Sequence, residues 1–258
     1  MPPTSTWNLP MFKKNLRRII LVAFCAFSLT TPLSGCTIFD AWLLPQPEMT
    51  AQDLFEAGNE AMLNKRYAWS AHHFKQLKDN FPFSPYVLEA ELSLADSYFL
   101  DEEWYMAIDA YKEFEAMHPR HAAIPYVLYQ IGQSCINSYT SIDRPPTLIH
   151  EAMSYYQRLI DSFPGDEYAE NAENKIQECR RILAQYEIFM GDFYFRAERY
   201  RSAWMRYQNV TRDYSDILDQ AEYANVQSQA SYFKQVQEET EKDRRQREGS
   251  WRNWFDWL

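Results

Sequence analysis

Apolar and small residues recur at three- and four-residue intervals along residues 51–214, which is the spacing of helices that bury one face. The spacing itself repeats along the chain. In a register that starts at Ala51, small residues stand at positions 8 and 20, aromatic residues at 17 and 24, and proline at 32: Gly58, Ser70, Tyr67, Phe74 and Pro82. A repeated helix-turn-helix unit of about 34 residues is the structure that this order predicts.

Three further units keep this order of small, aromatic and proline positions. The second, counted from Leu88, has Ala95, Trp104, Ala107, Tyr111 and Pro119. The third begins near Pro125 and places Gly132 at position 8; extra residues within 139–150 are needed to align Ala152, Tyr156 and Pro164. The fourth has Gly191, Tyr200, Ala203 and Tyr207, with Ser215 where the proline would stand.

This is the tetratricopeptide pattern, and its residue types have a physical reason. Small side chains let the two helices of a unit approach closely, an aromatic ring fills the space beside them, and proline ends the second helix. We therefore expect an all-α tetratricopeptide-repeat solenoid of about four to five helix pairs. Residues 51–123 would hold repeats one and two, and residues 124–233 repeats three and four with a partial fifth.

Two segments depart from the repeat. Residues 168–181 are already helical in composition and predict one unbroken helix as far as Arg196. Residues 219–233 predict the first helix of a fifth repeat, but residues 235–248 are nearly all charged or amide and predict a solvated helix or a flexible linker. The domain boundary is expected near residue 234, and residues 234–258 form a charged segment with a tryptophan-rich tail.

The first 35 residues read as an export signal. Four cations, Lys13, Lys14, Arg17 and Arg18, precede an apolar stretch over residues 19–29 that is too short to span a bilayer of about 30 Å. Leu33-Ser34-Gly35-Cys36 resembles the lipobox of bacterial lipoproteins, in which the cysteine thiol receives diacylglycerol before cleavage. We expect Cys36 to carry the S-diacylglycerol and N-acyl (palmitate-type) lipid, and residues 36–50 to form an extended tether. A short anchor helix is the alternative.

Composition narrows the function. The net charge of −10, from 26 basic and 36 acidic residues, argues against nucleic acid as a partner. No phosphate loop, dinucleotide fingerprint or metal motif stands out. We therefore expect neither catalytic activity nor a bound cofactor other than the lipid. For Cys135 and Cys179, a disulfide and two buried thiols both remain open.

The surface of a stacked array offers a binding wall instead. Positions 2, 5, 9, 12 and 13 of each first helix should face the concave side, where aromatic, thioether and amide groups suit an extended peptide. The candidates are Phe55, Asn59, Met62, Leu92, Asp96, Phe99, Tyr129, Gln133 and Asn137. The alternative is that half of them simply pack between repeats.

The end of the chain is rich in tryptophan. At helical spacing Trp251, Trp254, Phe255 and Leu258 share one face. Such a face can enter a lipid interface, anchor in a partner or cap the last repeat.

Taken together, the signal, lipobox, proline-containing tether and repeat series resemble the outer-membrane protein assembly factor BamD family. Three stretches carry the likeness most specifically: Asn80-Phe81-Pro82-Phe83-Ser84-Pro85-Tyr86, Asp161-Ser162-Phe163-Pro164, and the long helix from Ala184 through Tyr194. The resemblance covers residues 36 to about 223. The usual fifth repeat is replaced here by the charged segment.

The resemblance implies a non-catalytic lipoprotein of the outer membrane that faces the periplasm and serves the β-barrel assembly machinery. Its partners would be a BamA-type barrel, other lipoproteins of that machinery and unfolded barrel precursors. Repeats one and two would receive the aromatic C-terminal signal of the precursors, and Arg196, Arg199 and Arg201 would be candidates for docking. The alternative is another tethered tetratricopeptide adaptor, such as a secretin pilotin or a cell-division coordinator.

Overall fold

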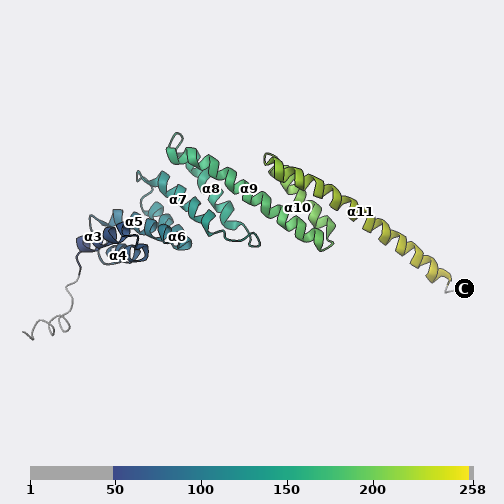
Figure 1. Ribbon diagram of the computed structural model, residues 1–258, viewed down its shortest axis with the longest axis horizontal. Coiled ribbons are helices and arrows are strands. Elements are labelled where there is room, and N and C mark those ends of the chain that lie inside the picture. Colours follow the sequence, from purple (N-terminus) through teal and green to yellow (C-terminus); the bar gives the residue numbers. More distant parts are fainter. Residues whose placement is uncertain (1–48, 256–258) are drawn as a thin grey trace, which may run out of the picture. The chain divides into compact units, whose positions relative to one another are not determined.

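The computed structural model describes residues 49–255, and side chains as far as residue 249. Cys36, the signal, most of the tether and the last three residues lie outside the described residues. Residues 50–255 form helices joined by short turns, with no strand in this region (Figure 1). The helices are α3 (Ala51–Leu63), α4 (Tyr67–Asn80), α5 (Val87–Leu100), α6 (Trp104–Met117), α7 (Ile124–Ser138), α8 (Thr147–Ser162), α9 (Glu167–Arg196), α10 (Tyr200–Asp213) and α11 (Leu218–Phe255).

Each helix packs mainly on the next one along the chain. The pairs α3/α4, α5/α6, α7/α8 and α9/α10 correspond to the four units that the sequence predicts, so the tetratricopeptide-repeat solenoid is confirmed. Thr50 begins the first helix with a capping box, in which its side chain and that of Asp53 exchange hydrogen bonds with each other's backbone N–H. The additional residues of the third unit are residues 139–146, between α7 and α8.

The contact between small and aromatic residues is the structural basis of the repeat. A Cβ atom placed on Gly58, Gly132 or Gly191 would lie 2.6, 2.6 or 2.5 Å from the ring of Phe74, Tyr156 or Tyr207 respectively. No real side chain tolerates such a distance. The second unit has alanine at this position, and Ala95 and Tyr111 are both fully buried.

The turns inside three of the units are also alike. Lys65, Glu102 and Glu198 have φ values of 56°, 61° and 57°, the left-handed region that L-residues rarely occupy. In each turn two backbone N–H groups bond back to the end of the preceding helix, as Glu102 N does to Phe99 O and Glu103 N to Tyr98 O. This is the Schellman ending, built here without glycine.

The long helix α9 joins two cores. It is unbroken, as the sequence predicts, has 30 residues, and runs beside α8 and then α10 (Figure 1). Ala169, Ala172 and Cys179 in its first half belong to the large core of α5–α8, whereas Ala184 in its second half belongs to the core around Tyr207. One helix is therefore the last layer of the third unit and the first layer of the fourth.

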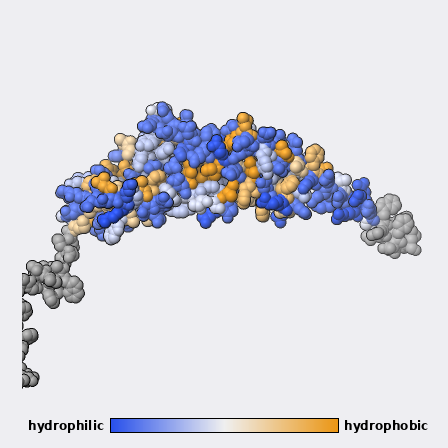
Figure 2. Space-filling model, viewed as in Figure 1, coloured by the Kyte–Doolittle hydropathy of each residue, from blue (hydrophilic) through white to orange (hydrophobic). Residues whose placement is uncertain are grey.

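The last helix is continuous where the sequence suggested a boundary. Residues 219–233 and 235–248, predicted as two segments, lie in a single helix, α11, of 38 residues. Ala224, Ser228 and Ser231 are buried against the fourth unit, and beyond Ser231 most side chains are exposed. Figure 2 shows mainly hydrophilic residues on this distal part of α11, so the solvated helix, not the flexible linker, is the outcome.

The two cysteines of the described residues are free thiols. Cys135 on α7 and Cys179 on α9 are both fully buried within the large core. Burial raises the pKa of each thiol to about 12, so the reactive thiolate is disfavoured. They act as small buried apolar groups, one of the two interpretations left open above.

Candidate peptide-binding wall and docking turn

The predicted wall residues form one stripe on each of three first helices. On α3 the stripe is Gln52, Phe55, Asn59 and Met62; on α5 it is Glu89, Leu92, Asp96 and Phe99; on α7 it is Tyr126, Tyr129, Gln133 and Asn137. The spacing of three and four residues puts each set on one helix face. A different face, which contains Gly58 or Gly132, packs against the second helix of the same unit. We call the three stripes together the first-helix wall.

Aromatic contacts fix the wall in place. Phe55 stacks on Tyr86 with ring centroids 5.1 Å apart, and Phe99 meets Trp104 edge-on at 5.3 Å. Tyr129 lies between the rings of Tyr156 and Tyr168, at 5.7 and 5.6 Å. All nine predicted wall candidates are half-buried, so they pack between elements and still present part of their surface.

The carboxylate of Asp96 is the polar centre of the wall. Its Oδ1 atom accepts hydrogen bonds from the hydroxyls of Tyr111, at 2.6 Å, and Tyr126, at 2.7 Å. Burial raises the pKa of Asp96, and the two tyrosine bonds only partly oppose this shift. Within the described residues Oδ2 has no hydrogen-bond partner, so the second oxygen remains available as an acceptor.

The fourth unit repeats this arrangement, which sequence reasoning missed. Asp192 Oδ1 accepts from Tyr207 at 2.6 Å and from Tyr223 at 3.0 Å. In both cases one tyrosine comes from the unit's own second helix and the other from the next first helix. The signal was available in the sequence, because each aspartate directly follows the small residue at position 8 and precedes the first tyrosine by 15 residues.

The three predicted docking arginines lie at the turn between α9 and α10. Arg196, Arg199 and Arg201 are exposed, and none of them forms an ion pair with a carboxylate in the part of the chain that the structure describes. Lys234 of α11 joins them at this end of the unit, since its Nζ lies 4.4 Å from the ring centre of Phe195 and 5.2 Å from that of Tyr200. Lys234 could not be predicted from spacing, because it stands in a different helix.

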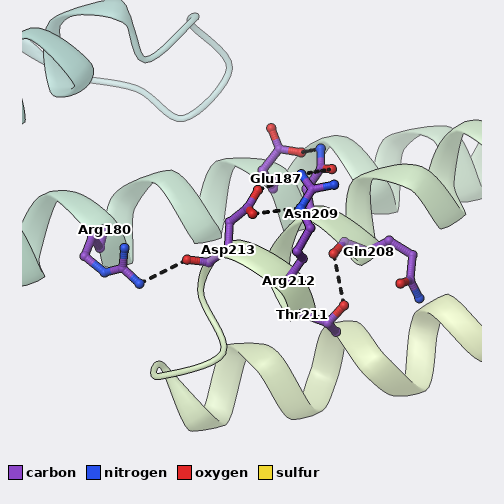
Figure 3. Close-up of polar contacts among 7 residues, drawn as sticks. All are labelled: Arg180, Glu187, Gln208, Asn209, Thr211, Arg212 and Asp213. Carbon is purple, nitrogen blue, oxygen red and sulfur yellow. Dashed lines mark hydrogen bonds and ion pairs between the residues drawn. The ribbon is translucent and has the colours of Figure 1, made fainter.

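A cavity of about 280 Å³ lies between α8, α9 and α10. Its lining includes His150, Tyr186 and Tyr214, together with three residues of the polar network in Figure 3: Glu187, Asn209 and Asp213. Glu187 in this network accepts from Asn209 at 3.0 Å and from Arg206 at 2.9 Å, while Arg212 donates twice to Asp213 at 2.8 Å. Its carboxylates are thus matched by the chain's own donors.

Neither a membrane-spanning helix nor a metal-binding group is found among the described residues. Among the helices between residues 49 and 255, none combines the length and the apolar composition that crossing a bilayer requires. The same region holds no group of three or more histidine, cysteine or acidic side chains placed to bind a metal ion.

The fold and wall define the class: a tetratricopeptide-repeat protein with an aromatic and amide-lined first-helix surface. The family model described as YfiO, outer membrane lipoprotein, matches residues 47–247. The chain therefore belongs to this outer membrane lipoprotein family, in agreement with the BamD resemblance, which is confirmed.

Individual relatives are distant but cover most of the chain. The outer membrane protein assembly factor BamD of Vibrio cholerae is 22% identical over 194 residues, covering 71% of this chain and 80% of that protein. The BamD of Neisseria meningitidis serogroup A is 23% identical over 211 residues, covering 78% and 79%. Among solved structures, the first TPR domain of human RPAP3 is similar with a TM-score of 0.41 and 18% identity, covering 53% of this chain and 94% of that one.

Proposed function

We propose that this protein is a non-catalytic scaffold of outer-membrane β-barrel assembly, anchored by lipid on Cys36 and facing the periplasm. The observation that carries the proposal is the family match over residues 47–247, because it spans the repeats, the fused helix α9 and most of α11. The relatives in this comparison are outer membrane protein assembly factors.

Two surfaces bind partners in this proposal, the first-helix wall and the turn between α9 and α10. The first-helix wall of repeats one to three binds extended segments of unfolded barrel precursors through its half-buried aromatic and amide groups. The exposed turn with Arg196, Arg199 and Arg201 docks on an acidic surface of a BamA-type barrel protein. Arginine suits that role, since its guanidinium forms paired hydrogen bonds with carboxylates.

Co-purification tests the assignment. The full chain, tagged at its C-terminus and expressed in its native envelope, is recovered from detergent-solubilised membranes and its partners are identified. A BamA-type barrel among stoichiometric partners is the expected result. Recovery of a secretin or a division protein in its place would contradict the proposal and support a different tethered adaptor.

The docking surface has its own test. Replacing Arg196, Arg199 and Arg201 by glutamate should abolish recovery of the barrel protein, because three exposed cations become anions. A matched control replaces three other arginines by glutamate. These arginines are exposed but paired with the chain's own acids: Arg212, Arg244 and Arg245. Equal loss in both triple variants would show that net charge, not the turn, governs association.

The lipid anchor is tested separately. Cys36→Ser should block both acylation and the cleavage that follows it, so the chain should keep its signal and be lost from the outer-membrane fraction. Mass spectrometry of the native N-terminal peptide should show the added acyl mass on Cys36. An unmodified Cys36 would refute the anchoring.

A further inference from the structure

Positive charge is confined to one of the two helix layers of repeats one to three. The first helices α3, α5 and α7 contain no lysine, arginine or histidine. α3 and α5 carry three carboxylates each. All the cations of these repeats' helices are on the second helices α4, α6 and α8.

Most lysines and arginines of the second helices form ion pairs with the chain's own carboxylates. Lys78 of α4 pairs with Glu113 of α6, Lys112 of α6 with Glu151 of α8, and Arg158 of α8 with Glu115 of α6. These pairs tie neighbouring second helices together. The lysines and arginines that lie outside the helices in residues 50–147, Lys65, Arg66, Arg120 and Arg144, are exposed and stand in turns beyond the ends of the first helices.

On the wall itself, two carboxylates lack a cation. Glu89 and Asp96 occupy the same stripe of α5, together with Leu92 and Phe99. Glu89 is exposed and forms no ion pair within the described region. Asp96 is held by two tyrosine hydroxyls on one oxygen, and burial without a cation raises its pKa. A cation brought by a ligand would relieve this uncompensated burial.

We propose that the first-helix wall selects extended polypeptide segments by charge: it binds aromatic segments that are neutral or cationic and rejects carboxylates, including the α-carboxylate at a chain end. The inference deepens the proposed function and rests on it, since it names the class of segment that the wall accepts. The aromatic part of the expected C-terminal signal fits the wall, but its terminal carboxylate does not.

The groups on the wall explain why it would prefer neutral or cationic segments. Aromatic side chains of a segment gain contact with Phe55, Phe99 and Tyr129, and the amides of Asn59 and Gln133 can hydrogen-bond to an extended backbone. A carboxylate in the same place would lose its water and would meet acids, hydroxyls and amides but no cation, so no opposite charge offsets its desolvation. A lysine or arginine would instead find Glu89 and the free oxygen of Asp96.

Four peptides of one extended sequence test the proposal against the purified full-length mature chain in detergent. All alternate phenylalanine or tyrosine with threonine and are acetylated; one ends in a free acid, one in an amide, and two amidated versions carry a central lysine or glutamate. We expect the amide to bind roughly threefold more tightly than the acid, and the lysine peptide roughly tenfold more tightly than the glutamate one, at low salt. Both ratios should shrink as salt is raised.

Charge variants localise the effect. Glu89→Lys should invert the acid-to-amide preference, because it places a cation on the wall. Asp109→Lys makes the same change in net charge at an exposed site of the second helix α6 and should leave the preference as in the wild type. Unchanged helical circular dichroism in both variants shows that they are folded.

The possible results distinguish a failure of charge selection from a failure of peptide binding itself. If all four peptides fail to bind, the wall is not a peptide-binding surface and both proposals fall. If they bind but the free acid or the glutamate peptide is preferred, or if both lysine variants act alike, only the charge selection is overturned.

Discussion

The core of repeats one to three and the core around α10 use the same contact of an aromatic ring on a small residue, but they are supported differently. In the former, a small apolar cluster, from Leu54 to Leu94, is followed by a large one that runs from Ala95 to Leu183. In the latter the apolar cluster is small and the helices are joined by polar bonds, such as Glu187 to Arg206 and Gln208 to Ser228.

The difference between the two cores predicts a difference in local stability. Apolar burial is insensitive to salt and scales with area, whereas partly exposed ion pairs contribute little and weaken with ionic strength. The first region is therefore a stable platform for a peptide-binding wall. The second is expected to open locally more often, which suits a surface that adapts to a partner.

The largest expected effect comes from filling the space beside the rings. Gly132→Ala in the first region and Gly191→Ala in the second would each force a ring to move, since the added Cβ lies at 2.6 and 2.5 Å. We expect each to lower the free energy of unfolding by about 1–3 kcal/mol. Hydrogen exchange should show faster opening of α7 and α8 in the first variant, and only of α10, α11 and the end of α9 in the second.

Gly249→Ala is the control for this comparison. No atom lies within 4 Å of the added Cβ, and the residue stands inside the solvated part of α11. It should strengthen that helix locally by about 0.5–1 kcal/mol. If Gly132→Ala were equally harmless, close approach would not be what selects glycine at position 8.

The tyrosine hydroxyls provide the next comparison. Tyr111→Phe removes a bond to Asp96 in the first region, and Tyr207→Phe removes the equivalent bond to Asp192 in the second. We expect losses of about 1–2 kcal/mol for each, measured by urea unfolding, because a bond to an ionised carboxylate is lost.

Tyr156 is the matched exception within the first region. Its hydroxyl is buried with no hydrogen-bond partner among the described residues. Tyr156→Phe should therefore leave stability unchanged or raise it slightly. A loss as large as that of Tyr111→Phe would mean that a partner group or water satisfies this hydroxyl in solution.

How much of this could be foreseen depends on the range of the interaction. Gly58, Gly132 and Gly191 mark the helix pairs because each has its aromatic partner in the same repeat; the interval is the same for Gly58 and Gly191 and longer for Gly132, where residues 139–146 intervene. The Tyr126 bond to Asp96 and the position of Lys234 beside Phe195 depend on how one unit is placed on the next, which local spacing does not encode. The continuous helix α11 was likewise hidden, because its distal half has no buried stripe and relies on helix propensity and on i,i+4 pairs such as Arg245 to Glu241.

The cavity between α8, α9 and α10 is a further case. Residues 139–146 were expected to lengthen the third unit, but nothing in their composition shows that Pro146 lines a cavity with Tyr186 and Tyr214. The nine wall candidates, by contrast, follow from helical spacing alone, and the structure does bring them onto three helix faces. Whether a peptide binds there remains a prediction.

Acidification should affect Asp96 of the first region and two aspartates of the second in opposite directions. Burial raises the pKa of Asp96, so between its ordinary value of 3.8 and the raised value the folded state holds more protons than the unfolded state. Stability from this group therefore falls as the pH rises through that window and increases as the pH is lowered. Wild type should gain relative to Asp96→Asn when urea unfolding is repeated at successively lower pH.

In the second region the sign is reversed. Hydrogen bonds from Arg212 and Arg180 lower the pKa of Asp213 and Asp216, whose contribution is present above 3.8 and is lost as the pH falls through the lowered values. The protection factors of amides in the turn before α11, taken relative to the intrinsic exchange rate at each pH, should fall first on acidification. A uniform response of both regions would contradict the division drawn above.

The smallest expected effect concerns the turns that the two regions share. Glu102 in the first region and Glu198 in the second have positive φ values of 61° and 57°, which glycine adopts without strain. Glu102→Gly and Glu198→Gly should each stabilise the protein by a few tenths to about 1 kcal/mol, because relief of strain exceeds the added freedom of the unfolded chain. Glu103→Gly is the matched control: its φ is −82°, so glycine there brings only the entropic cost and should destabilise. Thermal unfolding resolves the sign. If Glu102→Gly and Glu103→Gly shifted the melting temperature in the same direction, backbone strain in the turn would not be the cause.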